Sequence, residues 1–145
     1  MWLRFWSLGG FLAMMGGFIA LFASGNLLSL NPNVIIVQIA ALVLALWARR
    51  SLGLRSFHLT AEPTEGTLVT SGPYRVIRHP IYTAACLFVW PGALAHHSFP
   101  AFVLATLVTA GALIRIIYEE RTLAERYPEY ARYADTTNRM LPYVF

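Results

Sequence analysis

The sequence contains no lysine, a single cysteine and few charged residues, and each shortage excludes a class of protein. All eleven basic residues are arginine, and seven residues are acidic. Charged residues make up 12% of the chain and hydrophobic residues 57%, a balance that is too apolar for an ordinary soluble domain and typical of a membrane protein. Because Cys86 is the single cysteine, neither an internal disulfide nor a cysteine metal cluster can form, and its place within an apolar run predicts a small buried hydrophobe.

Several motifs of soluble enzymes are also missing. There is no GxGxxG motif for a dinucleotide and no serine on a nucleophile elbow. The histidines have no cysteine or paired carboxylate partners, so we predict no metal site; they are His58, His79, His96 and His97. The pI near 9.6 would suit nucleic acid, but the arginines stand beside apolar runs. We therefore predict that they orient the chain in a membrane and that no nucleic acid binds.

Four apolar stretches dominate what is present. They run from about Phe5 to Ala23, Val34 to Ala48, Ile81 to Ala95 and Phe99 to Tyr118. At about 1.5 Å per residue, helices of these lengths can cross a hydrocarbon core roughly 30 Å thick if the two shorter ones recruit flanking residues. The 145 residues suit a single domain, 1–145, with an N-terminal helix pair in residues 1–50.

The C-terminal segment has a different pattern. Leu123, Tyr127, Tyr130 and Ala134 recur at helical spacing, and Pro128 can open a new helical turn. This pattern predicts one or two short amphipathic helices beneath the bundle. The predicted fold class is thus all-α: an integral membrane bundle of about four transmembrane helices with a C-terminal cytoplasmic amphipathic segment.

The distribution of charge predicts the orientation. The links Ser24 to Asn33 and His96 to Ser98 contain no Arg, Asp or Glu, while the other links and both ends contain them. By the positive-inside rule, both termini and the segment around His79 face the cytoplasm of an inner membrane. Because the link at His96 is so short, the helices on either side should be antiparallel neighbours.

Small residues recur in the first apolar stretch at Gly9, Ala13 and Gly17. Small residues four apart let helices approach closely. This face is therefore a predicted packing seam and a candidate surface for homo-oligomer formation.

The first polar cluster lies where the third apolar stretch begins. Pro80 suits the first turn of a helix and pushes His79 out of helical conformation. The helix would begin with unpaired N–H groups beside Arg78 and His79, a corner that attracts a carboxylate or phosphate. The alternative is an interfacial anchor, for which Arg and Tyr are common.

The second polar cluster lies at the end of the fourth stretch. Arg115 and Glu119 are four residues apart and so share one helix face at the membrane boundary. They could form a functional site or a simple surface ion pair with a snorkelling arginine.

Together these pieces resemble a known family. The matching segments are Gly72-Pro-Tyr74, Arg78-His-Pro-Ile-Tyr82, Arg115, Glu119-Glu120-Arg-Thr-Leu123, Tyr127-Pro-Glu-Tyr130, Tyr133 and Arg139-Met-Leu-Pro142. In this order they are similar to the isoprenylcysteine carboxyl methyltransferase and phospholipid methyltransferase group of integral membrane enzymes. The resemblance covers residues 66–142, over half of the chain.

The resemblance implies a methyltransferase that uses S-adenosylmethionine, bound on the cytoplasmic side by residues 66–142. The residues it assigns to the cofactor are Val69 with the stretch from Gly66, Tyr74, His79, Pro80, Tyr82 and Glu119. It associates Arg115 with the acceptor. The implied catalytic residues are Arg115 and Glu119. The implied acceptor is a lipophilic molecule of the membrane that carries a carboxylate, an amine or a thiol.

The sequence departs from the family at a few positions, and two rival functions stay open. Ala84 stands where the family usually has glycine, and Tyr127-Pro128 where it has Phe-Gly. Membrane sterol reductases share a similar C-terminal half and use NADPH, but their motif has Asn, Gly and Glu where this chain has Ile81, Ala84 and Ala85. The other rival is a non-catalytic membrane scaffold.

Overall fold

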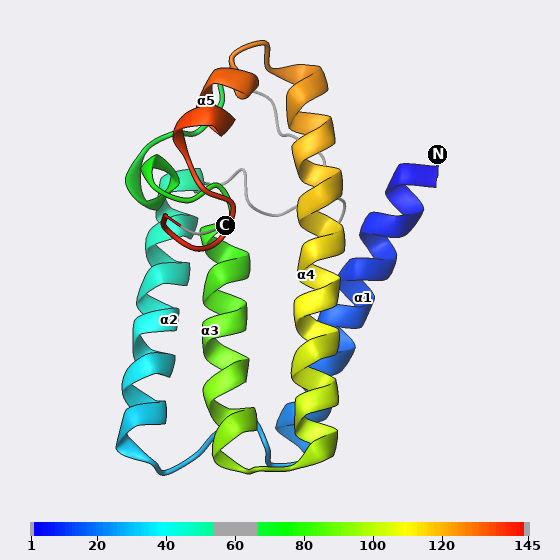
Figure 1. The fold of residues 1–145 in the computed structure, drawn as a ribbon, viewed down its shortest axis with the longest axis vertical. Helices are drawn as coiled ribbons and strands as arrows, with labels where there is room; N and C mark the ends of the chain where they lie inside the picture. Colours follow the sequence, from blue (N-terminus) through cyan, green and yellow to red (C-terminus); the bar gives the residue numbers. More distant parts are fainter. Residues whose placement is uncertain (1, 54–66, 144–145) are drawn as a thin grey trace.

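The computed structural model describes residues 2–53 and 67–143, with side chains from Phe5 onward. These residues form five α-helices and a short 3-10 helix, and no strand occurs within them. The all-helical prediction is therefore confirmed (Figure 1). The elements are α1 (Trp2–Ala23), α2 (Pro32–Leu52), η2 (Gly72–Arg75), α3 (Pro80–Ala95), α4 (Phe99–Arg126) and α5 (Tyr130–Thr136).

Local sequence explains where the helices begin and end. Pro32 occupies the first turn of α2, and the Asn31 side chain accepts a hydrogen bond from the Asn33 N–H at 3.0 Å. α4 continues well past the apolar stretch and ends at Arg126. Its end is set by Pro128, because a residue before proline is disfavoured in helical conformation, and Tyr127 is extended with φ −115° and ψ 108°. Only one short helix, α5, follows among the described residues.

The helices differ in how much of a bilayer they can cross. Within the described residues, α1, α2 and α4 are long and apolar enough to span a membrane. α2 gains flanking residues, as expected, but α3 does not, because His79 leaves helical conformation with φ −125°. Its 16 residues rise about 24 Å, whereas the 28 residues of α4 rise about 42 Å. The charged residues of α4 run from Arg115 to Arg126. The start of α3 therefore lies beside Glu119 and Glu120, in the middle of this stretch, and not beside the end of α4.

The chain folds as two helix pairs joined side by side. α1 packs along α4, α2 packs along α3, and α3 meets α4 as an antiparallel neighbour (Figure 1). The antiparallel arrangement across the short link is thus confirmed. One end of the bundle brings together the start of α1, the end of α2, the start of α3, the end of α4 and α5, and we call it the polar end.

The contact between α1 and α4 depends on glycine, but in a register that differs from the predicted seam. A Cβ on Gly10 would lie 2.9 Å from the Gly111 carbonyl oxygen, and a Cβ on Gly111 would lie 2.5 Å from that of Gly10. Gly17 packs against Val108, whereas Gly9 has open space around it. The expected seam through Gly9 is therefore wrong inside the bundle; the packing face runs through Gly10 and Gly17, seven residues apart.

The remaining core lies between small residues of α4 and larger ones of the other helices. At the end opposite the polar end it is formed by Leu21, Leu27, Val89, Ala93, Ala101, Ala105 and Val108. Gln38 is buried there and donates hydrogen bonds to the carbonyls of Leu27 at 2.8 Å and Phe88 at 3.0 Å.

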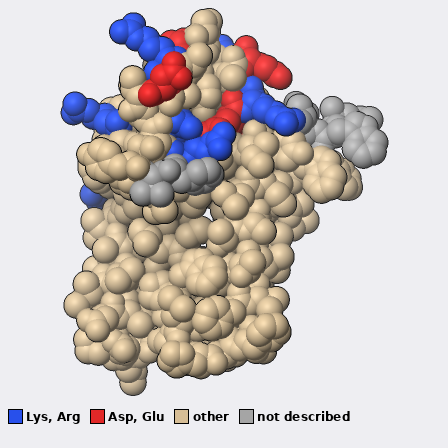
Figure 2. All heavy atoms as spheres, viewed as in Figure 1, with Lys and Arg blue, Asp and Glu red and all other residues tan. Residues whose placement is uncertain are grey.

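Away from the polar end the visible surface carries no charged side chains (Figure 2). This face of the molecule thus presents an uncharged body suited to lipid and one charged end.

Candidate functional site

The approach to α3 is held in place by a glycine turn. Gly72 has φ +61°, the left-handed region that favours glycine. A side chain here would also collide with the Ser51 hydroxyl and would lie 3.1 Å from Trp47 Nε1. This close contact fixes η2 against the end of α2 and leaves Tyr74 buried.

The C-terminal residues cross over the start of α3. Arg78 N–H donates to the Asn138 carbonyl at 2.7 Å, and His79 N–H donates to the Arg139 carbonyl at 2.9 Å. The Thr83 hydroxyl donates to the Met140 carbonyl at 2.8 Å. The N-terminus of α3, which the sequence predicts to attract an anion, is therefore partly covered by the C-terminal residues 138–140.

His79 lies between two carboxylates of α4. Its side chain is only 3% exposed, with Nδ1 3.5 Å from Glu119 Oε2 and Nε2 3.4 Å from Glu120 Oε1. The Nε2 contact is an ion pair without hydrogen-bond geometry. Burial alone would lower the pKa of His79, but the two adjacent carboxylates, Glu119 and Glu120, outweigh it and raise the pKa above its ordinary value of 6.5. A protonated imidazolium is thus favoured here.

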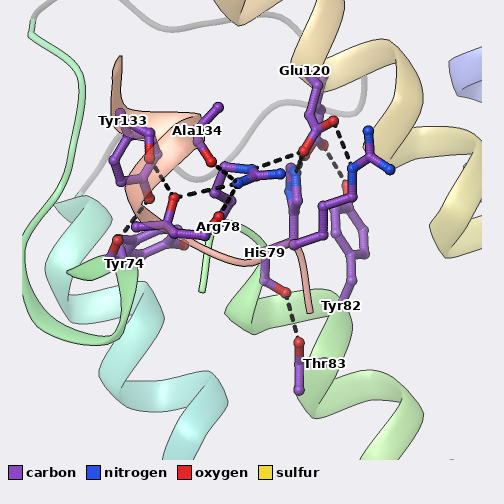
Figure 3. A network of polar contacts seen from close by, with 11 residues as sticks. Tyr74, Arg78, His79, Tyr82, Thr83, Glu120, Tyr133 and Ala134 are labelled. Atoms are coloured by element: carbon purple, nitrogen blue, oxygen red, sulfur yellow. Dashed lines mark hydrogen bonds and ion pairs between the residues drawn. The ribbon is translucent and has the colours of Figure 1, made fainter. Parts of the chain in front are cut away.

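Glu120 joins three segments that are distant in sequence. Its carboxylate accepts hydrogen bonds from Arg78 Nε at 3.0 Å and from Arg139 Nε at 2.9 Å, in addition to facing His79. Arg78 also donates to the carbonyls of Ala134, at 2.8 Å, and Thr137 (Figure 3). We call Arg78, Glu120 and Arg139 the Glu120 clamp. The clamp ties the start of α3 to α4, α5 and the C-terminal tail.

Glu119 has different partners and is more accessible. It accepts a hydrogen bond from the Tyr82 hydroxyl, and Oε1 lies 3.6 Å from Arg115 Nη2. Tyr82 in turn accepts a hydrogen bond from Arg115 Nε at 2.8 Å. The Glu119 side chain is 23% exposed, against 14% for Glu120. We call His79, Tyr82, Arg115 and Glu119 the polar cluster.

Arg115 is the deepest charged group of the polar cluster. The residue is 5% exposed and reaches across to α1, where Nη1 donates to the Ser7 carbonyl at 3.4 Å. The centre of the guanidinium lies 5.2 Å from the centroid of the Phe11 ring. Because these contacts come from three helices, the guanidinium is held in the bundle interior and is not a snorkelling surface group.

The other predicted residues lie around this cluster. Burial and the nearby charge of Glu119 raise the pKa of Tyr74, so its phenol stays neutral. Its carbonyl accepts a hydrogen bond from the Tyr133 hydroxyl at 2.7 Å. Pro80 is buried in the first turn of α3. Val69 is half-buried in the irregular segment before η2, and Gly66 lies outside the described residues.

Sequence reasoning missed several participants. It assigned Glu119 to the cofactor but gave Glu120 no role, whereas adjacent positions on α4 direct Glu119 to the polar cluster and Glu120 to the Glu120 clamp. Arg139 could have been found, since it is a lone charge in the tail motif. Nothing in the apolar pattern of α1 marks Ser7 or Phe11 as neighbours of Arg115.

No metal site emerges from the part of the chain that the structure describes. Within it, no group of three or more His, Cys, Asp or Glu side chains could hold a metal ion. His58 lies outside the described residues.

These features define an integral membrane protein with a buried, charged cluster at one end of an apolar helical bundle. Residues 33–130, well over half of the chain, match the family described as phospholipid methyltransferase. The chain therefore belongs to the phospholipid methyltransferase family, and the matched region is a membrane methyltransferase domain.

The similarity to one relative is more limited in extent. The chain is 40% identical over 79 residues to the cobalt-zinc-cadmium resistance protein CzcN of Cupriavidus metallidurans. The aligned region covers 52% of this chain but only 36% of that relative. No solved structure shows significant similarity to the chain.

Proposed function

We propose that the protein transfers a methyl group from S-adenosylmethionine to a lipophilic acceptor at the cytoplasmic face of the membrane. The observation that carries the proposal is the polar cluster: a cation, a carboxylate and a tyrosine hydroxyl in direct contact and largely shielded from water. Ionisable groups inside an apolar bundle are expensive, and a functional site is their most common explanation. The family membership supports the same activity.

The chemistry of the cluster suits the proposed methyl donor. S-adenosylmethionine has an ammonium, a carboxylate and a sulfonium, and when bound it supplies an electrophilic methyl group. Glu119, the more accessible carboxylate, can accept hydrogen bonds from the ammonium. The rings of Tyr74 and Tyr82 can face the positive charges, as aromatic faces attract cations. We propose that His79 helps to hold the carboxylate, with Val69 and Pro80 lining the same site.

The protein's own contribution is orientation and a dry environment. Arg115 lies deeper in the bundle than Glu119, so we propose that its guanidinium holds an anionic or polar head group of the acceptor. The acceptor would enter from the lipid and carry a carboxylate, an amine or a thiol. Methyl transfer needs in-line alignment of the reacting groups, and holding both partners at fixed points supplies it.

Further proposals concern placement and assembly. We propose that the polar end faces the cytoplasm, which places both termini on that side. Self-association could still use Gly9 and Ala13, since Gly9 is open to the surroundings, but Gly17 is occupied by Val108 of the same chain.

Ligand-induced stabilisation of the purified protein in detergent tests the proposed function. S-adenosylhomocysteine, which lacks the reactive methyl, should raise the thermal midpoint, and NADPH should not. Stabilisation by NADPH alone would favour the reductase, and a lack of response to both would favour a scaffold. The variant Glu119→Gln should reduce the stabilisation by S-adenosylhomocysteine. Its matched control is Glu125→Gln, because Glu125 is an exposed acid on the same helix.

The acceptor class can be found with membranes that contain the protein. Membranes incubated with a donor labelled in its methyl group should yield a labelled lipophilic product. Release of the label as methanol by mild alkali would indicate a carboxyl acceptor, while an alkali-stable label would indicate an amine or a thiol.

A further inference from the structure

The first helix reaches the polar cluster although it precedes the region that matches the family. That region begins at residue 33, whereas α1 ends at Ala23. Two groups of α1 contact the Arg115 guanidinium: the Ser7 carbonyl at 3.4 Å and the Phe11 ring at 5.2 Å from its centroid. Part of the environment of Arg115 thus comes from a helix outside the family match.

Close packing of α1 makes these contacts possible. Gly10 is so near α4 that a Cβ at this position would lie 3.2 Å from Arg115 Cγ and 2.9 Å from the Gly111 carbonyl oxygen. The absence of a side chain at Gly10 lets its neighbours in α1 reach around the arginine. Phe11 then presents its ring to the guanidinium at a distance within the usual cation–π range of about 6 Å.

The contacts on α1 complement those on α3 and α4. Tyr82 binds Nε, and Glu119 lies on the Nη2 side. Ser7 binds Nη1. The guanidinium is therefore held from opposite directions, by polar partners towards α3 and by a carbonyl and an aromatic ring towards α1.

We propose that Phe11 is a positioning residue that holds Arg115 in the orientation required for turnover. This inference rests on the proposed function. Phe11 acts through Arg115, so its loss should change kcat more than the affinity for the methyl donor. The aromatic face is the relevant property, because an aliphatic side chain of similar size fills space but does not attract a cation.

Three variants separate positioning from packing. Phe11→Leu removes the aromatic face, Phe11→Tyr keeps it, and Phe18→Leu is the matched control. Phe18 is on the same helix, but its ring stacks on that of Phe88 of α3 with the centroids 5.8 Å apart, in the core at the other end of the bundle. We expect Phe11→Leu to lower kcat about fivefold, in line with a desolvated cation–π contact. Phe11→Tyr should stay within about twofold of the wild type, and Phe18→Leu should keep kcat and lose only thermal stability.

A second measurement decides the inference without activity. The Nε–H NMR signal of Arg115, assigned by its disappearance in Arg115→Lys, should be shifted by the Phe11 ring current. The shift should be lost in Phe11→Leu and kept in Phe11→Tyr and Phe18→Leu. An Arg115 signal and a kcat that change equally in Phe11→Leu and Phe18→Leu would overturn the inference. If S-adenosylhomocysteine does not stabilise the wild type, the proposed function fails, whereas the NMR comparison still tests the positioning contact.

Discussion

His79 Nδ1 lies 3.5 Å from Glu119 Oε2, which connects the residue before α3 to the last third of α4. The short link between these helices makes them antiparallel, but their unequal lengths decide which residues meet. Because α3 begins at Pro80, His79 stands level with Glu119 and Glu120, and Tyr82, one turn deeper, stands level with Arg115. The site is thus a consequence of where α3 begins.

The two adjacent glutamates should behave differently when neutralised. Glu119→Gln should weaken binding of S-adenosylhomocysteine by about tenfold, since a hydrogen bond to a charged group contributes roughly 1.5–3 kcal/mol. Glu120→Gln should mainly destabilise the fold, by about 2–3 kcal/mol, because it leaves Arg78 and His79 without their shared carboxylate. Calorimetric titration measures the first effect and thermal melting in detergent the second.

Glu125→Gln is the control for both variants, because this exposed residue should change neither quantity. If Glu119→Gln binds S-adenosylhomocysteine like the wild type, the cofactor site does not include Glu119. If Glu120→Gln melts like the Glu125→Gln control, the Glu120 clamp does not stabilise the fold.

Replacing Arg115 should affect turnover more than donor binding. Arg115→Lys keeps a positive charge but loses the planar fork that reaches Tyr82 and Ser7 together. We expect kcat to fall by at least about tenfold, while the affinity for S-adenosylhomocysteine changes less than threefold. Steady-state kinetics with labelled donor, combined with binding measurements, gives both values. A selective loss of donor affinity would instead place Arg115 in the donor site.

Stability should depend on pH through His79. The pKa of this residue is raised in the folded protein by Glu119 and Glu120, in spite of its burial. When folding raises the pKa of a group, the group stabilises the fold fully at pH values below its unfolded-state pKa, which is 6.5 for histidine. This stabilisation is lost as the pH rises through the higher pKa of the folded state. The thermal midpoint of the wild type should therefore exceed that of His79→Gln most clearly near pH 6. The difference should shrink towards pH 9, and a difference that grows with pH would contradict a protonated His79.

Much of this architecture could be predicted from the sequence. The apolar runs predict the helices because a membrane allows few other structures, and the short link at His96 predicts the antiparallel contact of α3 and α4. Pro80 correctly marked the start of α3. These signals are local or compositional, so they can be recognised without knowing which faces of the helices meet.

The features that sequence reasoning missed depend on rotation about the helix axis. In an almost uniformly apolar helix such as α1, hydrophobic periodicity does not show which side is buried. The spacing of small residues therefore predicts a packing seam through Gly9, whereas Gly10 makes the contact with α4. No feature of the sequence indicates that Phe11 lies beside Arg115. The pairing of the tail with the start of α3 likewise depends on backbone hydrogen bonds, which side-chain patterns do not encode.

The register of α1 against α4 can be tested with two neighbouring glycines. Gly10→Ala places a methyl group 2.9 Å from the Gly111 carbonyl, so the helices must separate, and we expect a loss of about 1–3 kcal/mol. Gly9→Ala meets nothing within 4 Å and should be neutral or stabilising by up to about 1 kcal/mol, because alanine favours helix. Thermal melting of the two variants checks the contrast. Since Gly10 also brings α1 close to Arg115, Gly10→Ala should lower kcat as well, whereas equal stability and turnover in both variants would show that α1 packs in another register.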